Sequence, residues 1–287
     1  MYCVSVLQNY HCQMITASIV VYKTLPTELG NIIECSLRAP IQTIFVVDNS
    51  PTNSLQHFIE QHHSTKLHYI WGQGNVGYGA AHNIAIRQSF MLKARYHIVL
   101  NPDISFKDGT IESLTQFMDE HPDVGLIMPN VIYPDGSLQC LCKLLPTPMD
   151  IFARRFFPKS WVKRRNKSYE MHFMGYDKTW DCPNLSGCFM FMRNVFLEQA
   201  GGFDDRFFMY FEDTDLVRRL HRVCKTIFYP KVTIVHAHKA EHRKNNALLK
   251  ISIRSAMLYF NKYGWLFDRE RRRVNRKAKE KDSQVTD

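Results

Sequence analysis

Short apolar runs alternate with segments of helical spacing along the first hundred residues, and this pattern constrains the fold more than any other feature. Four runs have the length and content of buried strands: residues 16–21, 43–47, 67–71 and 96–100. Segments compatible with helices follow the first three runs, at residues 27–37, 55–61 and 80–92. This alternation predicts an α/β domain with a mainly parallel sheet, whose ligand lies outside the carboxyl ends of the strands.

Polar residues directly follow two of these strands. The second strand ends on Asp48 and Asn49, and the fourth runs into Asn101, Pro102 and Asp103. Proline restricts the backbone, so that the neighbouring carboxylate projects at the sheet edge. A carboxylate in that place suits a divalent cation whose other coordination sites are open to phosphate oxygens. The two strand ends therefore predict a site for a nucleoside diphosphate with a metal ion.

Between these strand ends lies a glycine-rich stretch, GQGNVGYGAAHN, at residues 72–83. Gly72, Gly74 and Gly77 have the G-x-G-x-x-G spacing of a dinucleotide-binding turn, and Asp103 closes the next strand where that motif expects an acid. Such glycines usually follow the first strand of a domain, whereas two strand-helix units precede them here. On the residues alone, an NAD-dependent oxidoreductase therefore remains an alternative to a protein with a nucleoside-diphosphate and metal site.

The second half of the chain carries a group of acids. Residues 180–193 turn at Ser186 and Gly187 into an apolar strand, and the aromatic run 207–211 leads to Glu212, Asp213 and Asp215, which open a helix expected at 216–223. Acids at a helix start stabilise it as caps and through the macrodipole. Three acids behind aromatic residues exceed that need, and a carboxylate there is placed to take a proton from a hydroxyl nucleophile.

Histidines follow a short strand expected at residues 233–235. His236, His238 and His242 are closely spaced there, which favours one of them as a metal ligand, and a structural histidine is the alternative.

Cysteine content and hydropathy indicate in which cellular compartment the chain is expected. The eight cysteines show no paired C-x-x-C spacing and follow no signal peptide, which predicts reduced thiols in the cytosol and argues against a zinc site. No apolar run approaches the roughly 20 residues of a membrane-spanning helix.

The formal net charge of +10 is concentrated in two segments, residues 154–167, where aromatic residues are interleaved, and residues 269–281. Such segments suit an anionic membrane surface. A solvated face with a disordered tail is the alternative. Nothing in the sequence resembles a nucleic-acid-binding module, so no nucleic-acid partner is expected.

Taken in order, these motifs resemble those of family 2 glycosyltransferases, and within them the rhamnosyltransferases of bacterial O-antigen and cell-surface polysaccharide synthesis. The resemblance runs from about residue 16 to 264 and is carried by DNS at 48–50, NVGYG at 75–79 with Asn83, LNPD at 100–103, SG at 186–187, GFD at 202–204 and FEDTDL at 211–216.

The resemblance implies a GT-A fold, a mixed, mainly parallel sheet flanked by helices. The implied organisation is a leader at 1–15, a transferase domain at 16–240 with a donor half (about 16–130) and an acceptor half (about 131–240), and a basic helical extension at 241–287. The residues implied to bind the donor are Tyr22, Asp48, Asn49, Asn75, Gly77, Gly79, Asn83, Asn101 and Asp103.

The resemblance also implies the chemistry, an inverting transfer. Asp213 matches the general base, with Glu212 and Asp215 as competitors. Asp103 matches the metal-binding acid of a D-x-D-like motif for Mg²⁺ or Mn²⁺, and His236 is expected to complete that site because Asn101 replaces the first acid.

The expected donor is dTDP-rhamnose, with UDP- and GDP-sugars as alternatives, and the expected acceptor is a lipid-linked glycan. The enzyme is expected in the cytoplasm, peripheral on the cytoplasmic face of the inner membrane and held there by its basic segments. A non-catalytic glycan-binding protein on the same fold is a further alternative.

Overall fold

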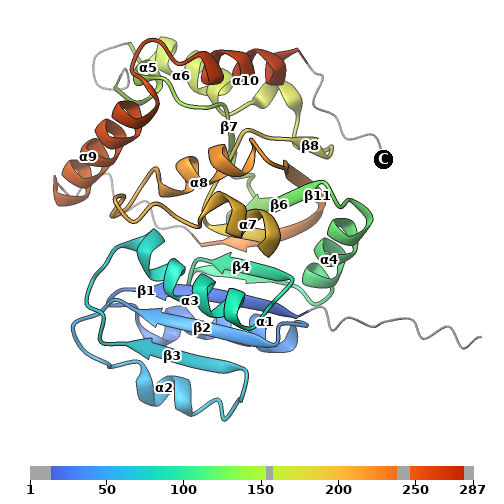
Figure 1. Cartoon of the computed structure of the whole chain (residues 1–287), viewed down its shortest axis with the longest axis vertical. Coiled ribbons are helices and arrows are strands. Elements are labelled where there is room, and N and C mark those ends of the chain that lie inside the picture. Colours follow the sequence, from blue (N-terminus) through green and yellow to red (C-terminus); the bar gives the residue numbers. More distant parts are fainter. Residues whose placement is uncertain (1–13, 153–157, 238–245, 281–287) are drawn as a thin grey trace, which may run out of the picture.

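The computed structural model describes residues 14–152, 158–237 and 246–280. Within them a nine-stranded sheet has helices on its faces (Figure 1), with the strand order β3-β2-β1-β4-β10-β6-β11-β5 and with β8 paired to β11. Both parallel and antiparallel pairs occur, and the predicted mixed, mainly parallel sheet with flanking helices is confirmed.

The amino-terminal half has the predicted strand-helix alternation. Its elements are β1 (Ile15–Val21), α1 (Pro26–Arg38), β2 (Thr43–Asp48), α2 (Gln56–Glu60), β3 (Leu67–Trp71), α3 (Tyr78–Met91), β4 (Tyr96–Leu100), β5 (Ile104–Phe106) and α4 (Thr110–Glu120). Strand β1 pairs in parallel with β2 and β4, and β2 pairs in parallel with β3. The carboxyl ends of these strands therefore meet at one edge, where Asp48 and the loop after β4 lie.

The second half adds strands to the same sheet and helices beyond it. Its elements are β6 (Val124–Ile132), β7 (Cys142–Lys143), α5 (Pro148–Phe152), α6 (Lys159–Tyr169), the 3-10 helix η2 (His172–Met174), β8 (Trp180–Asp181), β9 (Asn184–Leu185), β10 (Phe189–Arg193), α7 (Asn194–Ala200), α8 (Glu212–Leu220), β11 (Lys225–His236), α9 (Asn246–Tyr263) and α10 (Arg269–Lys279). Strand β10 lies antiparallel between β4 and β6, so one sheet runs through both halves.

Two expected boundaries were wrong. Helix α8 begins at Glu212 rather than at 216, so all three acids lie in its first turn, where their charge complements the helix dipole. Strand β11 extends over Lys225–His236 rather than 233–235, because its first part pairs with both β6 and β8. The basic segment at 269–279, for which a disordered tail was the alternative, is the helix α10.

A polar chain lies inside the otherwise apolar core, between β1, β4 and α3. The Ser18 hydroxyl is 2.7 Å from His82 Nδ1 and 2.9 Å from His97 Nε2, and the Thr16 hydroxyl is 2.8 Å from His97 Nδ1. Burial lowers the pKa of both imidazoles, that of His97 to about 3 and that of His82 well below its usual value, with the nearby His97 adding to the second effect. Both histidines are therefore neutral in the folded protein.

The carboxyl-terminal helices are fixed to α8 by a buried ion pair. Arg218 and Asp268 are each 2% exposed and lie 2.8 Å apart in a two-pronged contact. Arg218 also donates to the Tyr259 hydroxyl at 3.1 Å and to Glu270 at 2.6 Å. Asp268 caps α10 by accepting from the Arg271 N–H at 2.9 Å. Helices α9 and α10 are thus packed parts of the folded chain.

The cysteines in the described ranges are free thiols. Among the helices described, none combines the length and apolarity needed to span a bilayer.

Candidate active site

The carboxylate at the end of β2 is buried and held from two sides. Asp48 Oδ1 accepts from the Ser50 N–H at 2.8 Å, and Oδ2 accepts from the Tyr69 hydroxyl at 2.6 Å. Gln73 donates to the Asp48 carbonyl at 2.8 Å and to Asn49 Oδ1 at 3.2 Å. The predicted donor-binding acid is therefore a fixed group. The sequence did not single out Tyr69 or Gln73, since their partners lie on another strand.

Two of the glycines in the stretch at 72–83 lie tightly against another segment of the chain. Gly77 has φ +93°, and a Cβ there would collide with the backbone carbonyl of Phe208. A Cβ on Gly79 would lie 2.9 Å from Phe203 Cβ. A Cβ added to Gly72 or Gly74, by contrast, would meet nothing within 4 Å. The glycines at 77 and 79 are thus required for packing against residues 203–208.

The asparagines of this region mainly hold backbone. Asn83 donates to the Phe203 carbonyl at 2.8 Å and accepts from the Phe203 N–H at 2.9 Å, so it holds the turn at that residue. Asn49 donates to the Gly77 carbonyl at 3.1 Å, and Asn75 accepts from the Gly77 N–H at 3.4 Å. Tyr22 lies after β1 and is 49% exposed, open to solvent.

The predicted metal-binding pair is brought together at the ends of β4 and β11. Asp103 Oδ1 lies 3.3 Å from His236 Nε2, and Asn101 Nδ2 lies 3.5 Å from the same nitrogen. Gln139 Oε1 is 2.9 Å from His236 Nδ1, and Gln139 Nε2 donates to the His236 carbonyl at 2.8 Å. An amide oxygen on Nδ1 favours the tautomer whose Nε2 lone pair faces Asp103, as in metal-binding histidines. No motif near Gln139 in the sequence predicted its contact with His236.

These residues fit a divalent cation that is shared with a ligand. One carboxylate and one imidazole suit Mn²⁺ or Mg²⁺ when phosphate oxygens complete the coordination. Within the described ranges, no three or more His, Cys, Asp or Glu side chains are grouped to hold a metal by themselves. His238 and His242 lie outside the described residues.

Asp213 faces a cavity of about 440 Å³ in the second half of the molecule. Its Oδ2 accepts from the Gly187 N–H at 2.9 Å, and its Oδ1 accepts from the Thr214 N–H at 2.7 Å. The Thr214 hydroxyl also donates to Oδ1 at 3.4 Å, whereas Oδ2 keeps a further lone pair for a ligand. The cavity walls include Lys143, Asp150, Tyr169, Asn184, Ser186, Tyr210 and Leu249.

The other two acids of α8 have different surroundings. Asp215 is fully buried and satisfied: it accepts from Arg219 at 2.8 Å, from Lys262 at 2.6 Å and from the Tyr263 hydroxyl at 2.7 Å. Burial, with the charge of Asp213 adding, raises the pKa of Glu212 well above its usual value and favours the protonated form. Of the three acids, Asp213 is thus the best placed to accept a proton.

Tyr78 joins the two predicted sites. Its hydroxyl lies 2.9 Å from Asn101 Oδ1 and 2.8 Å from the Gly187 carbonyl, and Gly187 in turn contacts Asp213. Burial raises the pKa of Tyr78 well above its usual value, and the charges of Glu212, Asp213 and Asp103 add to this effect. Asp103 and Asp213 therefore lie in one neighbourhood. The sequence feature that could have pointed to Tyr78 is its position as an aromatic residue between Gly77 and Gly79.

Solved structures of glycosyltransferases share this fold. A structure of GalNAc-T7 with UDP, GalNAc and Mn²⁺ aligns over 90% of this chain and 50% of that one, at a TM-score of 0.62 and 12% identity. A Pyrobaculum calidifontis mannosyltransferase in complex with GDP-Man and Mn²⁺ aligns over 92% and 73%, at a TM-score of 0.54 and 15% identity. At these identities the likeness shows the fold alone, which is GT-A.

Sequence relatives are glycosyltransferases too. An N-acetylglucosaminyl-diphospho-decaprenol L-rhamnosyltransferase of Mycobacterium tuberculosis is 26% identical over 214 residues, 70% of this chain and 67% of that protein. A low-salt glycan biosynthesis hexosyltransferase of Haloferax volcanii is 28% identical over 180 residues, 62% of this chain and 52% of that protein. The family model "Glycosyl transferase family 2" matches residues 17–200. The chain therefore belongs to glycosyl transferase family 2.

Proposed function

We propose that this glycosyltransferase moves L-rhamnose from dTDP-rhamnose to a hydroxyl of a lipid-linked glycan, with inversion, in surface polysaccharide synthesis of the O-antigen type. The observation that carries the proposal is the placement of the Asp103–His236 pair and of Asp213 around one partly buried tyrosine, Tyr78. The mycobacterial relative, named as a rhamnosyltransferase acting on a diphospho-decaprenol, supports the choice of donor and acceptor.

The residues divide the reaction between them. Asp213 takes the proton from the acceptor hydroxyl as that oxygen attacks the anomeric carbon and the bond to the donor diphosphate breaks. The hydroxyl attacks one face of the anomeric carbon and the diphosphate leaves from the opposite face, which inverts the configuration at that carbon. When bound by Asp103 and His236, Mg²⁺ or Mn²⁺ supplies positive charge that stabilises the leaving nucleoside diphosphate. Asp48, held by Tyr69, binds the nucleotide base.

A screen of nucleotide sugars tests the donor. Purified protein is incubated with dTDP-rhamnose, UDP-sugars or GDP-sugars and Mn²⁺, with and without EDTA, and release of the nucleoside diphosphate is measured. We expect dTDP-rhamnose to be turned over fastest and EDTA to stop the reaction. Preference for a UDP- or GDP-sugar would contradict the rhamnosyl assignment, and full activity in EDTA would contradict the metal assignment.

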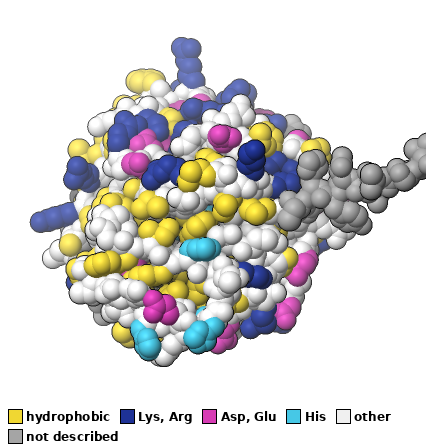
Figure 2. All heavy atoms as spheres, turned by 60° about the horizontal axis from the view of Figure 1, so that its bottom comes forward, with side chains coloured by type: hydrophobic (Ala, Val, Ile, Leu, Met, Phe, Trp, Pro, Cys, Tyr) yellow, Lys and Arg dark blue, Asp and Glu magenta, His cyan; other side chains and the backbone are white. Residues whose placement is uncertain are grey.

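The enzyme is proposed to work at the cytoplasmic face of the inner membrane. Trp265, Leu266 and Phe267, between α9 and α10, are 38%, 70% and 83% exposed, and Arg269 and Arg272 beside them are exposed as well. Apolar side chains flanked by basic ones suit an anionic lipid surface. Figure 2 looks onto the end of the molecule with α2 and β3, where hydrophobic side chains and a histidine lie near the centre and Lys and Arg lie mostly toward the outline.

Sedimentation with phosphatidylglycerol vesicles tests this location. We expect Leu266→Ser/Phe267→Ser to reduce the bound fraction strongly. Met91→Ser/Leu92→Ser is the matched control, because these residues at the end of α3 are also exposed, by 67% and 44%. Equal binding of both variants and the unchanged protein would refute the anchor.

The two alternatives from other classes are set aside. Family membership identifies a glycosyltransferase. The glycines that match the dinucleotide fingerprint also differ: a Cβ on Gly77 would collide with Phe208, whereas a Cβ on Gly72 or Gly74 would meet nothing within 4 Å. We expect a spectroscopic titration with NADH to show no binding.

A further inference from the structure

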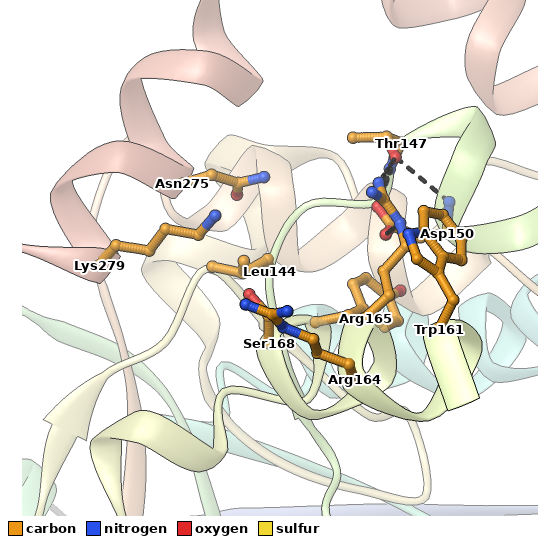
Figure 3. A pocket seen from close by; sticks show the side chains of 10 residues that line it. Leu144, Thr147, Asp150, Trp161, Arg164, Arg165, Ser168, Asn275 and Lys279 are labelled. Atoms are coloured by element: carbon orange, nitrogen blue, oxygen red, sulfur yellow. Dashed lines mark hydrogen bonds and ion pairs between the residues drawn. The ribbon is translucent and has the colours of Figure 1, made fainter.

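A second cavity adjoins the one that Asp213 faces. It has a volume of about 340 Å³ and lies between α6 and α10 (Figure 3). It shares Asp150 and Tyr169 with the cavity of about 440 Å³ that Asp213 faces, here called the acceptor cavity. We propose that it binds the diphosphate group of the lipid-linked acceptor. The inference rests on the proposed function, because it assumes an acceptor whose sugar is joined to lipid through phosphate.

The charges of this cavity favour an anion. Arg164 and Arg165 reach it from α6, and Lys279 reaches it from α10 (Figure 3). Arg165 is neutralised by Asp150, with Nε 2.7 Å from the carboxylate. Arg164 and Lys279 form no ion pair with any residue that the structure describes, and both are exposed. Two basic groups therefore remain for a ligand.

The positive surface continues along α10. A neighbouring cavity of about 530 Å³ shares Thr147, Asn275 and Lys279 with the first and adds Arg272 and Arg276. The only acid on its wall is Glu280, 3.7 Å from Arg276. Arginine matches phosphate oxygens with its planar fork, and lysine binds them as a compact charge. The excess of basic groups suits a ligand with more than one negative charge.

The walls of the cavity are held by the fold. Asn275 donates to the Leu145 carbonyl and accepts from the Leu145 N–H, both at 2.9 Å, which fixes α10 to the wall. Asp150 accepts from the Thr147 hydroxyl at 2.5 Å, and Arg165 donates to the same hydroxyl at 2.9 Å. A site formed before the ligand arrives loses less free energy in ordering side chains.

Position distinguishes an acceptor phosphate from the donor's. The donor diphosphate belongs near Asp103, across Tyr78 from Asp213. The cavity between α6 and α10 opens instead on the acceptor side, next to Asp150 and Tyr169. A sugar with its hydroxyl at Asp213 would thus direct its phosphate end toward Arg164 and Lys279, and its lipid toward the exposed loop at 265–267.

The test is a calorimetric titration of the full chain with farnesyl diphosphate. It is run in EDTA, which removes metal-dependent binding at Asp103, and inorganic pyrophosphate is added as a competitor. The variant is Arg164→Gln/Lys279→Gln, and the charge-matched control is Arg87→Gln/Lys107→Gln, two exposed residues of the amino-terminal half. We expect about tenfold weaker binding in the variant, unchanged affinity in the control, and competition by pyrophosphate.

The outcomes separate the sources of phosphate. Equal affinity of variant and unchanged protein, or no binding by either, overturns the proposal. Loss of binding to phosphatidylglycerol vesicles with unchanged farnesyl diphosphate affinity also overturns it, because the groups would then serve bilayer headgroups. Hydrolysis of the nucleotide sugar without acceptor should be equal in all three proteins. If no nucleotide sugar is turned over at all, the proposed function fails, while the titration still reports on the cavity.

Discussion

Three acids in the first turn of α8 have different surroundings, and the surroundings divide their roles. Asp215 is neutralised by Arg219 and Lys262, which makes it a structural group. Glu212 is buried and favours its protonated form. Asp213 lines the cavity of about 440 Å³ and keeps a further lone pair on Oδ2. Neighbouring carboxylates can thus be a base, an acid and an ion-pair partner according to their environment.

Replacing the base should affect turnover far more than binding. We expect Asp213→Asn to lower turnover about 10²–10⁴-fold, the usual contribution of a general base, and to leave donor affinity unchanged. The measurement is nucleoside diphosphate release with a calorimetric titration of dTDP. Asp108→Asn, at a carboxylate 78% exposed, is the control and should behave as the unchanged protein. Unaltered turnover in Asp213→Asn would remove Asp213 from this role.

Removing the carboxylate of the Asp103–His236 pair should affect the binding of the nucleotide rather than turnover. We expect dTDP to bind the unchanged protein more tightly with Mn²⁺ than in EDTA, and Asp103→Ala to lose most of that difference. The reason is that His236 alone holds a divalent cation weakly. Calorimetry with and without Mn²⁺ measures both affinities. The same gain from Mn²⁺ in both proteins would show that Asp103 is not a ligand.

The candidate site was predictable where a carboxylate directly follows a strand or lies at the start of a helix. Asp48, Asp103 and Asp213 each follow a recognisable pattern of apolar residues and turns. Gln139 and Tyr69 were not predictable, because each acts through a contact between distant segments, with His236 and Asp48 respectively. No local pattern encodes such a contact. The roles of all these residues stay predictions until the variants are measured.

At the scale of elements, the turn into α3 depends on unequal glycines. Gly74 and Gly77 both have positive φ, +71° and +93°, but a Cβ would collide with Phe208 only at Gly77. We expect Gly74→Ala to lower the free energy of unfolding by about 1–2 kcal/mol, the cost of a left-handed alanine. Gly77→Ala should lose about 1–3 kcal/mol more because of the collision. Urea denaturation measures both, and equal losses would contradict this account.

Strand β1 carries the hydroxyls that contact the buried imidazoles of His82 on α3 and His97 on β4, and these imidazoles make stability depend on pH. The pKa of each buried histidine is lower in the folded than in the unfolded protein. The histidine's contribution to stability is therefore complete above pH 6.5 and is lost as the pH falls toward its folded-state pKa, about 3 for His97. For His97 we expect the free energy of unfolding to fall by about 2 kcal/mol between pH 7.5 and pH 5, and His82, whose pKa is also lowered, should add a loss of the same sign. Urea denaturation at the two pH values checks this for His82 and His97.

A substitution separates this effect from other titrations. His97→Gln should lose about half of the pH dependence, and His63→Gln, at an exposed position of the loop after α2, should retain all of it. The same slope in both variants would show that acid destabilisation has another origin.

The fold was predictable where sequence pattern is local. Strands β1 to β4 were expected within about one residue of their observed ends, since each is a compact apolar run between polar breaks. Strand β11 was expected at three of its residues, because charged Lys225 and Lys231 interrupt its apolar pattern. The insertion of β10 between β4 and β6 is a contact across the sequence and has no local signature.

At the scale of the whole molecule, ion pairs tie the carboxyl-terminal segment to α8, and among those described Arg218–Asp268 has both side chains almost fully buried. Arg218→Ala would leave Asp268 buried without its partner, and we expect a loss of about 3–5 kcal/mol in unfolding free energy. Arg273→Ala, at an exposed position of α10, should change it by less than about 0.5 kcal/mol. Urea denaturation compares the two, and a similar small loss in both would mean that α9 and α10 are held mainly by apolar packing.

The place of β10 in the sheet has a consequence for biosynthesis. While the ribosome has delivered only the segments up to residue 188, β4 has one neighbour and β6 has none, because β10 and β11 are still to come. Unpaired strand edges of this kind attract other chains. We therefore expect the nascent polypeptide to be prone to association with other chains until Phe189–Arg193 emerges and closes the gap.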